Sequence, residues 1–134
     1  MTTDKTPAIP GVIPYFTVSD TKAATAFYEK AFGAKLIDRR EMPDSRSMHV
    51  HVEINGGAMM FNDPFPEHGT KDEPPQNIVL HLIVDDPDKW WKRATDAGLE
   101  VLVPLEVAFW GDKYGQVKDR FGVTWGIVGP AKAA

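Results

Sequence analysis

The sequence contains no cysteine among its 134 residues. This absence excludes a disulfide framework, a thiolate zinc site and a cysteine nucleophile. A chain of this length buries about two-thirds of its unfolded surface on folding, so it needs neither disulfides nor a structural metal for stability. We therefore expect a single domain that spans residues 1–134.

The chain also lacks an excess of basic residues and any long hydrophobic run. It has 15 Lys and Arg against 19 Asp and Glu, a formal net charge of −4, whereas a nucleic-acid binder needs a basic face. No apolar run approaches the roughly 20 residues of a membrane-spanning helix, and no basic segment followed by an apolar one marks a secretory signal. The sequence thus predicts a cytoplasmic protein that binds neither nucleic acid nor membrane.

What the sequence does contain is two similar strand–helix units. Residues 12–18 are rich in β-branched and aromatic side chains, which predicts a strand. Apolar residues then recur at helical spacing from Ala23 to Phe32, and Gly33 is placed to end that helix. The second unit repeats the design, with a strand over residues 77–84 and a helix that follows Asp86.

The spacing between the units is constant and indicates an internal repeat. Val18 and Val84 are 66 residues apart, as are Asp20 and Asp86. Further strand patterns follow each helix, at residues 34–40, 47–54 and 58–62, then 99–103, 115–118 and 123–128. We predict an α+β fold of duplicated βαβββ modules whose eight strands form a cup-like mixed sheet with the helices on its outer face. Module one covers about 12–62, a proline-rich linker covers 63–76, and module two covers about 77–128. The alternative is a ferredoxin-like α+β chain in which the repeat is a coincidence.

Two longer motifs carry a family resemblance. PYFTVSDTKAATAFYEKAFGAK (14–35) resembles the first module of the vicinal oxygen chelate superfamily, which includes glyoxalase I, bleomycin-resistance proteins, fosfomycin-modifying enzymes and extradiol dioxygenases. FWGDKYGQVKDRFGVTWGI (109–127) is similar to the second-module ending of the PhnB-like subgroup, except that Arg120 replaces a proline. The resemblance covers residues 14–128 and implies a glyoxalase-like fold and a homodimer, while the superfamily hosts many chemistries.

The resemblance also places the four metal-ligand positions of the family, two in each module. They fall at Ile13, Met60, Val79 and Gly126. Ile, Val and Gly offer no ligand atom, and a Met thioether prefers soft ions. We therefore predict that the family metal site is absent and that the protein uses no cofactor.

The third strand of module one places polar side chains on one face. His49, His51 and Glu53 alternate with apolar residues, and in the resembled fold their face lines the cavity. His81 lies two residues after Val79, on the same face as that family ligand position. Three hypotheses remain open for His49, His51 and Glu53: they bind a polar ligand, one histidine serving as general acid or base; they form a relocated metal site; or they face solvent or a dimer partner.

Aromatic and charged residues between Phe109 and Gly115 form the second candidate site. Trp110 and Tyr114 supply flat apolar surface with a polar atom, and Asp112 lies between them. Such a segment suits the rim of a pocket for a planar ligand; alternatively, Trp110 and Tyr114 cover the open side of the sheet. Met60 is the candidate floor of the cavity, because methionine adapts to irregular shapes.

Two classes of function follow. The first is a metal-free protein that binds a small planar or aromatic molecule in the cup, as the bleomycin-resistance branch does. The second is a lyase, isomerase or dioxygenase-type enzyme that uses a rebuilt metal site or histidine acid–base chemistry. The sequence leaves open whether the protein is an enzyme.

Overall fold

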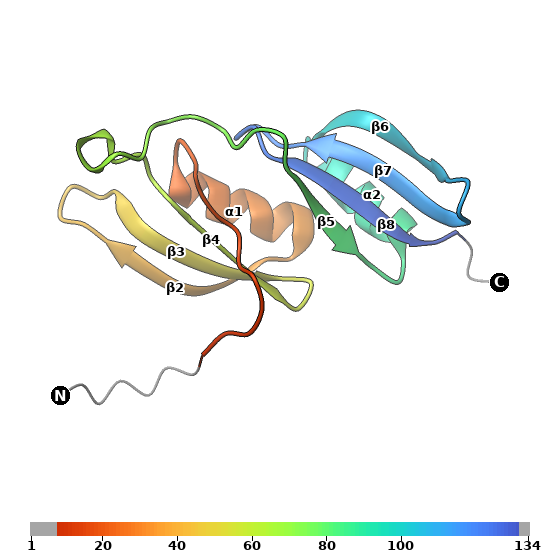
Figure 1. Cartoon of the computed structure of the whole chain (residues 1–134), viewed down its shortest axis with the longest axis horizontal. Coiled ribbons are helices and arrows are strands. Elements are labelled where there is room, and N and C mark those ends of the chain that lie inside the picture. The colour runs from red at the N-terminus through yellow and green to blue at the C-terminus, as the bar shows by residue number, and fades with distance from the viewer. Residues whose placement is uncertain (1–7, 132–134) are drawn as a thin grey trace.

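The structure, a computed structural model, describes residues 8–131 (Figure 1). Two modules lie side by side along the long axis of the molecule, and each contains four strands and one helix. Module one contains β1 (Tyr15–Thr17), α1 (Thr21–Phe32), β2 (Lys35–Glu41), β3 (Ser47–Ile54) and β4 (Gly57–Asn62). Module two contains β5 (Val79–Ile83), α2 (Pro87–Asp96), β6 (Glu100–Val107), β7 (Asp112–Lys118) and β8 (Thr124–Pro130). A short 3-10 helix, η1 (Pro66–His68), lies in the connection between them.

Each module forms its own mixed sheet, with strand orders β1-β4-β3-β2 and β5-β8-β7-β6. The first strand is parallel to the last in both modules, and the remaining pairs are antiparallel. The duplicated α+β fold is therefore confirmed. Within residues 8–131 the eight expected strands form two sheets of four and no closed barrel. No helix of that part of the chain is long and apolar enough to cross a membrane.

Both helices begin and end where the local chemistry dictates. The side chain of Asp20 accepts hydrogen bonds from the backbone N–H groups of Lys22 and Ala23, and Gly33 ends α1 in the left-handed region at φ 70°. In α2, the side chain of Asp86 accepts from the N–H of Lys89 in the same way. The caps fix where each helix starts, and the apolar side chains decide which face packs on the sheet.

The core lies where α1 meets both sheets. Tyr28 of α1 is fully buried. Its ring packs against Phe32 and Phe61 of module one and against Phe121 and Trp125 of module two. Apolar burial of this kind is the main stabilising term in folding. The two modules therefore share one core.

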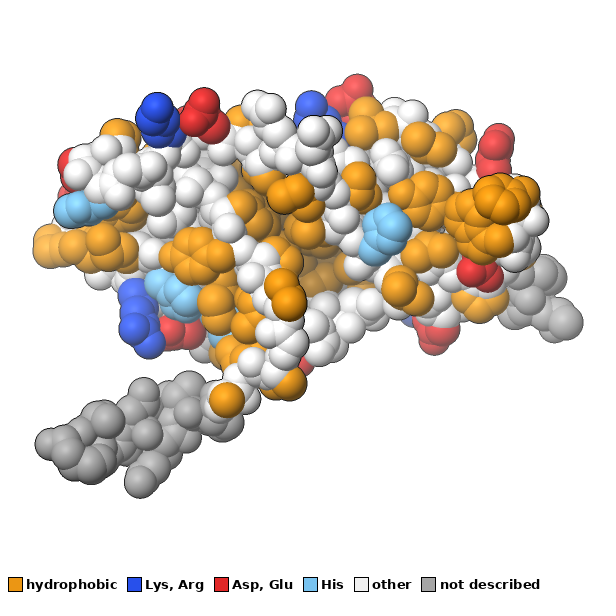
Figure 2. Space-filling model, in the orientation of Figure 1, with side chains coloured by type: hydrophobic (Ala, Val, Ile, Leu, Met, Phe, Trp, Pro, Cys, Tyr) orange, Lys and Arg blue, Asp and Glu red, His pale blue; other side chains and the backbone are white. Residues whose placement is uncertain are grey.

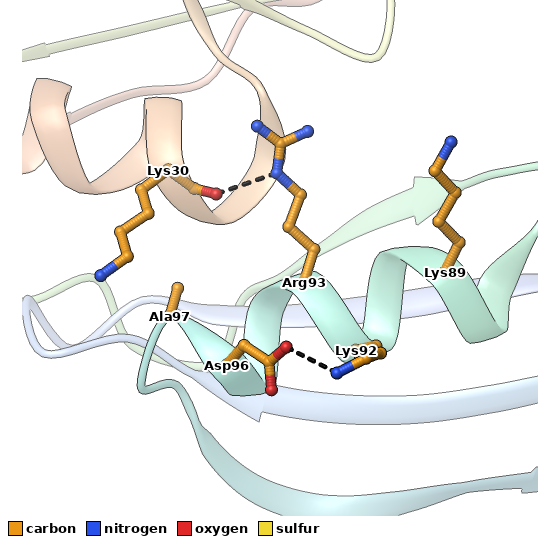
Figure 3. A pocket seen from close by; sticks show the side chains of 6 residues that line it. All are labelled: Lys30, Lys89, Lys92, Arg93, Asp96 and Ala97. Atoms are coloured by element: carbon orange, nitrogen blue, oxygen red, sulfur yellow. Dashed lines mark hydrogen bonds and ion pairs between the residues drawn. The ribbon is translucent and has the colours of Figure 1, made fainter.

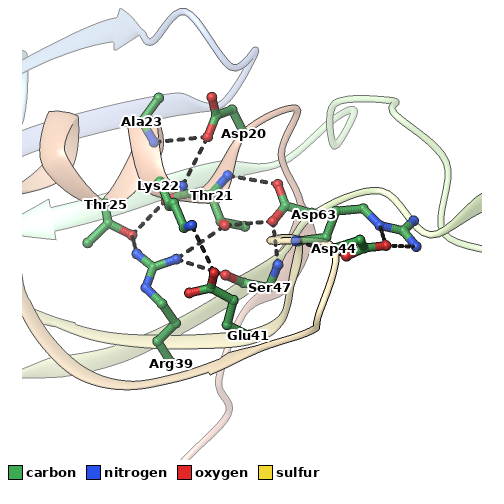
Figure 4. Close-up of polar contacts among 11 residues, drawn as sticks. Asp20, Thr21, Lys22, Ala23, Thr25, Arg39, Glu41, Asp44, Ser47 and Asp63 are labelled. Atoms are coloured by element: carbon green, nitrogen blue, oxygen red, sulfur yellow. Dashed lines mark hydrogen bonds and ion pairs between the residues drawn. The ribbon is translucent and has the colours of Figure 1, made fainter.

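A buried polar network joins the start of α1 to β2 and β3 of the same module (Figure 4). The carboxylate of Asp63 accepts hydrogen bonds from the N–H and hydroxyl of Thr21 at 2.9 and 2.7 Å and from the N–H of Ser47 at 2.6 Å. Arg39 donates to the hydroxyls of Ser47 and Thr25. Asp63 therefore joins α1 to β3, which carries the histidine candidates.

Some strand boundaries differ from the expected ones. β1 is only three residues long, and β7 begins at Asp112 rather than at Gly115. The alternation of β3 also breaks at its start, where Met48 is 37% exposed and Ser47 is buried, because the register of β2 and β3 shifts between Arg40 and Glu41. Trp110 therefore lies in the β6–β7 turn, while Asp112 and Tyr114 are strand residues.

Candidate functional site

The uncovered face of sheet one carries His49, His51, Glu53 and Met60. His51 and Met60 are opposite each other on β3 and β4, and Glu53 is opposite Ala58. The three β3 side chains are half-buried or exposed, while their apolar neighbours are buried, as the alternation predicts. His49, His51 and Glu53 therefore form one polar stripe along β3, and Met60 lies beside it on β4.

His49 is the member of this stripe with a perturbed environment. Its ring lies 5.8 Å from the ring of Tyr15, whose hydroxyl donates to the carbonyl of Met48 at 2.9 Å. Burial, followed by the nearby charge of Arg40, lowers the pKa of His49 below its ordinary 6.5. Burial raises the pKa of the Tyr15 phenol. Both shifts favour the neutral form of the group concerned.

Sheet two carries a separate hydrogen-bonded cluster. Gln116 Nε2 donates to the hydroxyl of Tyr114 at 2.8 Å, and that hydroxyl lies 3.3 Å from Nε2 of His81. The ring of Trp110 lies 6.0 Å from that of Tyr114. The structure thus brings His81, Tyr114 and Trp110 together, with Gln116 as a further member. Asp112 lies at the base of the β6–β7 hairpin, where its carbonyl accepts from the N–H of Ala108.

Gly126 makes this cluster possible. It lies on β8 opposite both His81 and Gln116. A Cβ at position 126 would come within 2.6 Å of His81 Cδ2, 3.0 Å of His81 Nε2 and 3.1 Å of the Tyr114 hydroxyl. The space above Gly126, where a side chain would otherwise project, is occupied by the imidazole and the phenol.

A cavity of about 250 Å³ lies between the modules beside His81. Its walls come from the start of β4, from β5 and from β8, and Figure 2 shows a hollow rich in hydrophobic side chains near the middle of the molecule. Met59 lines this cavity and Met60 does not. The lining residues are Pro14, Ile54, Gly57, Ala58, Met59, Val79, Leu80, His81, Leu82 and Trp125.

Two further hollows are of a different kind. One of about 190 Å³ on sheet one includes His51 and Glu53 among its lining residues. Another of about 360 Å³ lies between α1 and α2 and is lined mainly by cationic side chains (Figure 3). There Arg93 donates to the carbonyls of Lys30 and Glu29 at 2.9 and 3.1 Å, so it caps the carbonyl end of α1.

The four positions that the resemblance gives as family ligands carry almost no ligand atoms. Ile13, Met60, Val79 and Gly126 together offer one thioether sulfur. In the part of the chain that the structure describes, no three His, Asp or Glu side chains converge closely enough to hold an ion. His49, His51 and Glu53 alternate along one strand, and within residues 8–131 they belong to no group of three that could hold an ion. The residues at the four family positions therefore do not fit a hard divalent cation.

Two residues of these faces were not predicted from the sequence. Gln116 lies two positions after Tyr114 on β7, so strand alternation places both on one face. Tyr15 lies two positions after Ile13 and relates to it as His81 relates to Val79. A systematic reading of i, i+2 partners finds both.

Comparison with known proteins supports the fold seen here. The family model described as Glyoxalase/Bleomycin resistance protein/Dioxygenase superfamily matches residues 12–127. The protein Mb0911c of Mycobacterium bovis is 37% identical over 129 residues, an alignment that covers 92% of this chain and 85% of the relative.

Two solved structures share the fold at lower identity. Protein PA1353 from Pseudomonas aeruginosa superposes with a TM-score of 0.74 at 24% identity, and the match covers 89% of this chain and 96% of the other. The PhnB protein from Bacillus cereus superposes with a TM-score of 0.71 at 16% identity, over 90% of this chain and 99% of the other.

Proposed function

The chain belongs to the glyoxalase/bleomycin resistance protein/dioxygenase superfamily, and we propose that within it this protein is a metal-free binder of a small planar or aromatic molecule. The observation that carries the proposal is the packing over Gly126. At this family ligand position a side chain would collide with His81 and Tyr114. Ile13 and Val79, two of the other positions, have no ligand atom.

The cavity beside His81 suits such a ligand. Most of its lining side chains are apolar, and His81 and Trp125 are the two that carry a nitrogen. Ligand pockets commonly combine apolar walls with a few polar groups that fix orientation. Trp110 and Tyr114 add aromatic surface on the neighbouring strand and turn. A flat, mostly apolar molecule would bury its surface here and keep one polar contact.

Metal analysis of the purified, tag-free protein tests the metal-free proposal. We expect far less than one equivalent of zinc, nickel, manganese or iron per chain. We also expect no change in the double variant His49→Ala, His51→Ala, and thermal stabilisation by aromatic ligands rather than by divalent ions. Near-stoichiometric metal in the wild type that is lost from the double variant would contradict the proposal and would favour a lyase or dioxygenase.

A second candidate function is a histidine-dependent enzyme of the lyase or isomerase kind. The contact between His81 and Tyr114 favours it, because a phenol and an imidazole in contact can exchange a proton. Turnover of a ligand found by thermal shift, lost in His81→Ala, would distinguish this function from binding alone.

We further propose that the protein is a cytoplasmic homodimer. The edge strand β6 exposes Val101, Val103 and Val107, which are 45%, 41% and 61% exposed. β2, at the edge of the other sheet, exposes Leu36 and Ile37. Apolar side chains on unpaired edges of this kind are usually covered by a partner.

A further inference from the structure

The two sheets carry related tyrosine–histidine pairs at equivalent positions. Tyr15 on β1 lies 5.8 Å, ring to ring, from His49 on β3, and His81 on β5 lies 5.5 Å from Tyr114 on β7. Tyr15 and His81 are 66 residues apart, and His49 and Tyr114 are 65 apart. The two modules therefore hold the same pair with the residue types exchanged.

In each module, the residue on the strand between the tyrosine and the histidine decides whether the two side chains form a hydrogen bond. In module one Tyr15 is paired with Met60, and the Tyr15 hydroxyl donates to a backbone carbonyl. In module two His81 is paired with Gly126, and without a side chain there the Tyr114 hydroxyl reaches His81 Nε2. Module one serves as an internal comparison in which the two rings are neighbours but their polar atoms are not bonded to each other.

Gln116 sets the direction of the hydrogen bonds. Its Nε2 donates to the Tyr114 oxygen, which leaves the phenol proton for a further acceptor, and a neutral imidazole nitrogen accepts well. A chain in which N–H donates to O–H and O–H donates to N is mutually polarised. Nε2 of His81 then accepts, so its proton resides on Nδ1. None of the hydrogen bonds found within residues 8–131 uses that Nδ1, which leaves it for a ligand.

The lining of the cavity limits what that ligand is. Of the two polar side chains there, Trp125 donates its indole N–H to Asp119 at 2.9 Å, which leaves His81 for the ligand. The lining contains no Asp, Glu, Lys or Arg. A charged ligand would lose hydration without gaining a counter-charge, whereas a neutral oxygen needs a single donor.

We propose that Gln116, Tyr114 and His81 form a hydrogen-bond relay that presents the Nδ1–H of His81 to the oxygen of a neutral carbonyl compound. The apolar body of that compound occupies the cavity between the modules. This inference rests on the proposed binding function and names its ligand class. Since the cavity of about 250 Å³ lies below the ~300–1,000 Å³ of pockets for drug-sized ligands, the ligand is a small ketone, aldehyde, ester or amide.

The tautomer of His81 tests the relay by itself. Long-range ¹H–¹⁵N NMR of the full chain should show His81 protonated on Nδ1 at neutral pH. Tyr114→Phe removes the donor to Nε2 and should shift the population toward Nε2–H, and Gln116→Ala should shift it in the same direction. Tyr15→Phe, the equivalent change in module one, should leave His81 unchanged. A wild-type His81 protonated on Nε2 would overturn the relay.

Three probes of one shape test the ligand class: acetophenone, benzoate and ethylbenzene. We expect acetophenone to bind best and His81→Leu to weaken it about three- to tenfold, the effect of one hydrogen bond between neutral groups. Ethylbenzene should bind wild type and His81→Leu equally.

The outcomes separate this inference from the function on which it rests. Equal affinity for acetophenone and ethylbenzene in wild type overturns the carbonyl contact but leaves a binding protein. Preference for benzoate overturns the neutral ligand class. Absence of binding by all three probes overturns the binding function together with its ligand, while the tautomer measurement decides the relay independently.

Discussion

Asp119 receives four hydrogen bonds while only 4% exposed. The Tyr28 hydroxyl and the Trp125 indole donate to its carboxylate, as do the backbone N–H groups of Phe121 and Val123. A buried carboxylate is tolerated where donors compensate its lost hydration. Tyr28 belongs to module one and the other donors to module two, so this single residue joins the modules. Spacing within the sequence does not reveal that contact, because Tyr28 lies 91 positions away.

The variant Tyr28→Phe should destabilise the protein by about 1–3 kcal/mol, because it deprives a buried carboxylate of a donor. Burial, and then the charge of Asp119, raise the pKa of the Tyr28 phenol well above its ordinary 10.0. The unfolded chain therefore loses this proton at a lower pH than the folded one. The contribution of Tyr28 is complete below pH about 10 and is lost as the pH rises toward the folded pKa.

Urea unfolding of wild type and Tyr28→Phe, followed by tryptophan fluorescence from pH about 8 to about 11, measures this contribution. The difference in the free energy of unfolding should shrink at the alkaline end. A difference that stays constant across the range would show that the folded state does not hold the phenol proton.

At the positions of the candidate site, sequence reasoning succeeds where it depends on residue type and strand alternation. It finds that Ile13, Val79 and Gly126 lack ligand atoms, and it places His49 and His51 on one face. It does not find that His81 and Tyr114 meet, because that contact depends on the empty space above Gly126. The contact between His81 and Tyr114 depends on β5 and β7 both pairing with β8, and no local sequence pattern encodes that arrangement.

At the scale of elements, Asp63 fixes α1 against β3. Its carboxylate lies at the N-terminal end of α1 and is 7% exposed. An anion is favourable at that end of a helix, and three donors reach this one. β3 carries His49 and His51, so the network also sets where those histidines lie.

Asp63→Asn should lower the free energy of unfolding by about 2–3 kcal/mol, because an amide NH₂ would face N–H donors that now bind an oxygen. Asp44→Asn is the matched control: Asp44 is an exposed partner of Arg46, and exposed ion pairs contribute little. Chemical unfolding of both variants measures the contrast. Equal effects of the two substitutions would show that the network does not stabilise α1.

Element boundaries were predictable where apolar alternation is clean and not elsewhere. The expected strand over residues 47–54 agrees with β3, because its apolar residues alternate regularly. β7 begins at Asp112, earlier than the sequence predicts, because Asp112 and Lys113 are not typical strand residues. In the structure Lys113 Nζ forms an ion pair with Asp88 Oδ1 at 2.8 Å. Tertiary partners lengthen this strand beyond its local pattern.

At the scale of the whole molecule, the exposed valines of β6 predict self-association. Static light scattering should give twice the chain mass of 14.9 kDa. Val101→Glu should reduce it to one chain mass, because a carboxylate would be buried in the interface. Val12→Glu, at a fully exposed position, is the matched control and should remain dimeric. A wild type that stays monomeric at the highest concentration tested would contradict the proposed dimer.

The contact between Tyr28 and Asp119 also distinguishes the two halves of the repeat. The position in α2 equivalent to Tyr28 is Ala94, and the position in β4 equivalent to Trp125 is Met59. Two copies of module one would leave the Tyr28 hydroxyl without its carboxylate, and two copies of module two would leave Asp119 without its phenol. The two halves are therefore complementary rather than interchangeable at this contact, and neither half would satisfy it if paired with a second copy of itself.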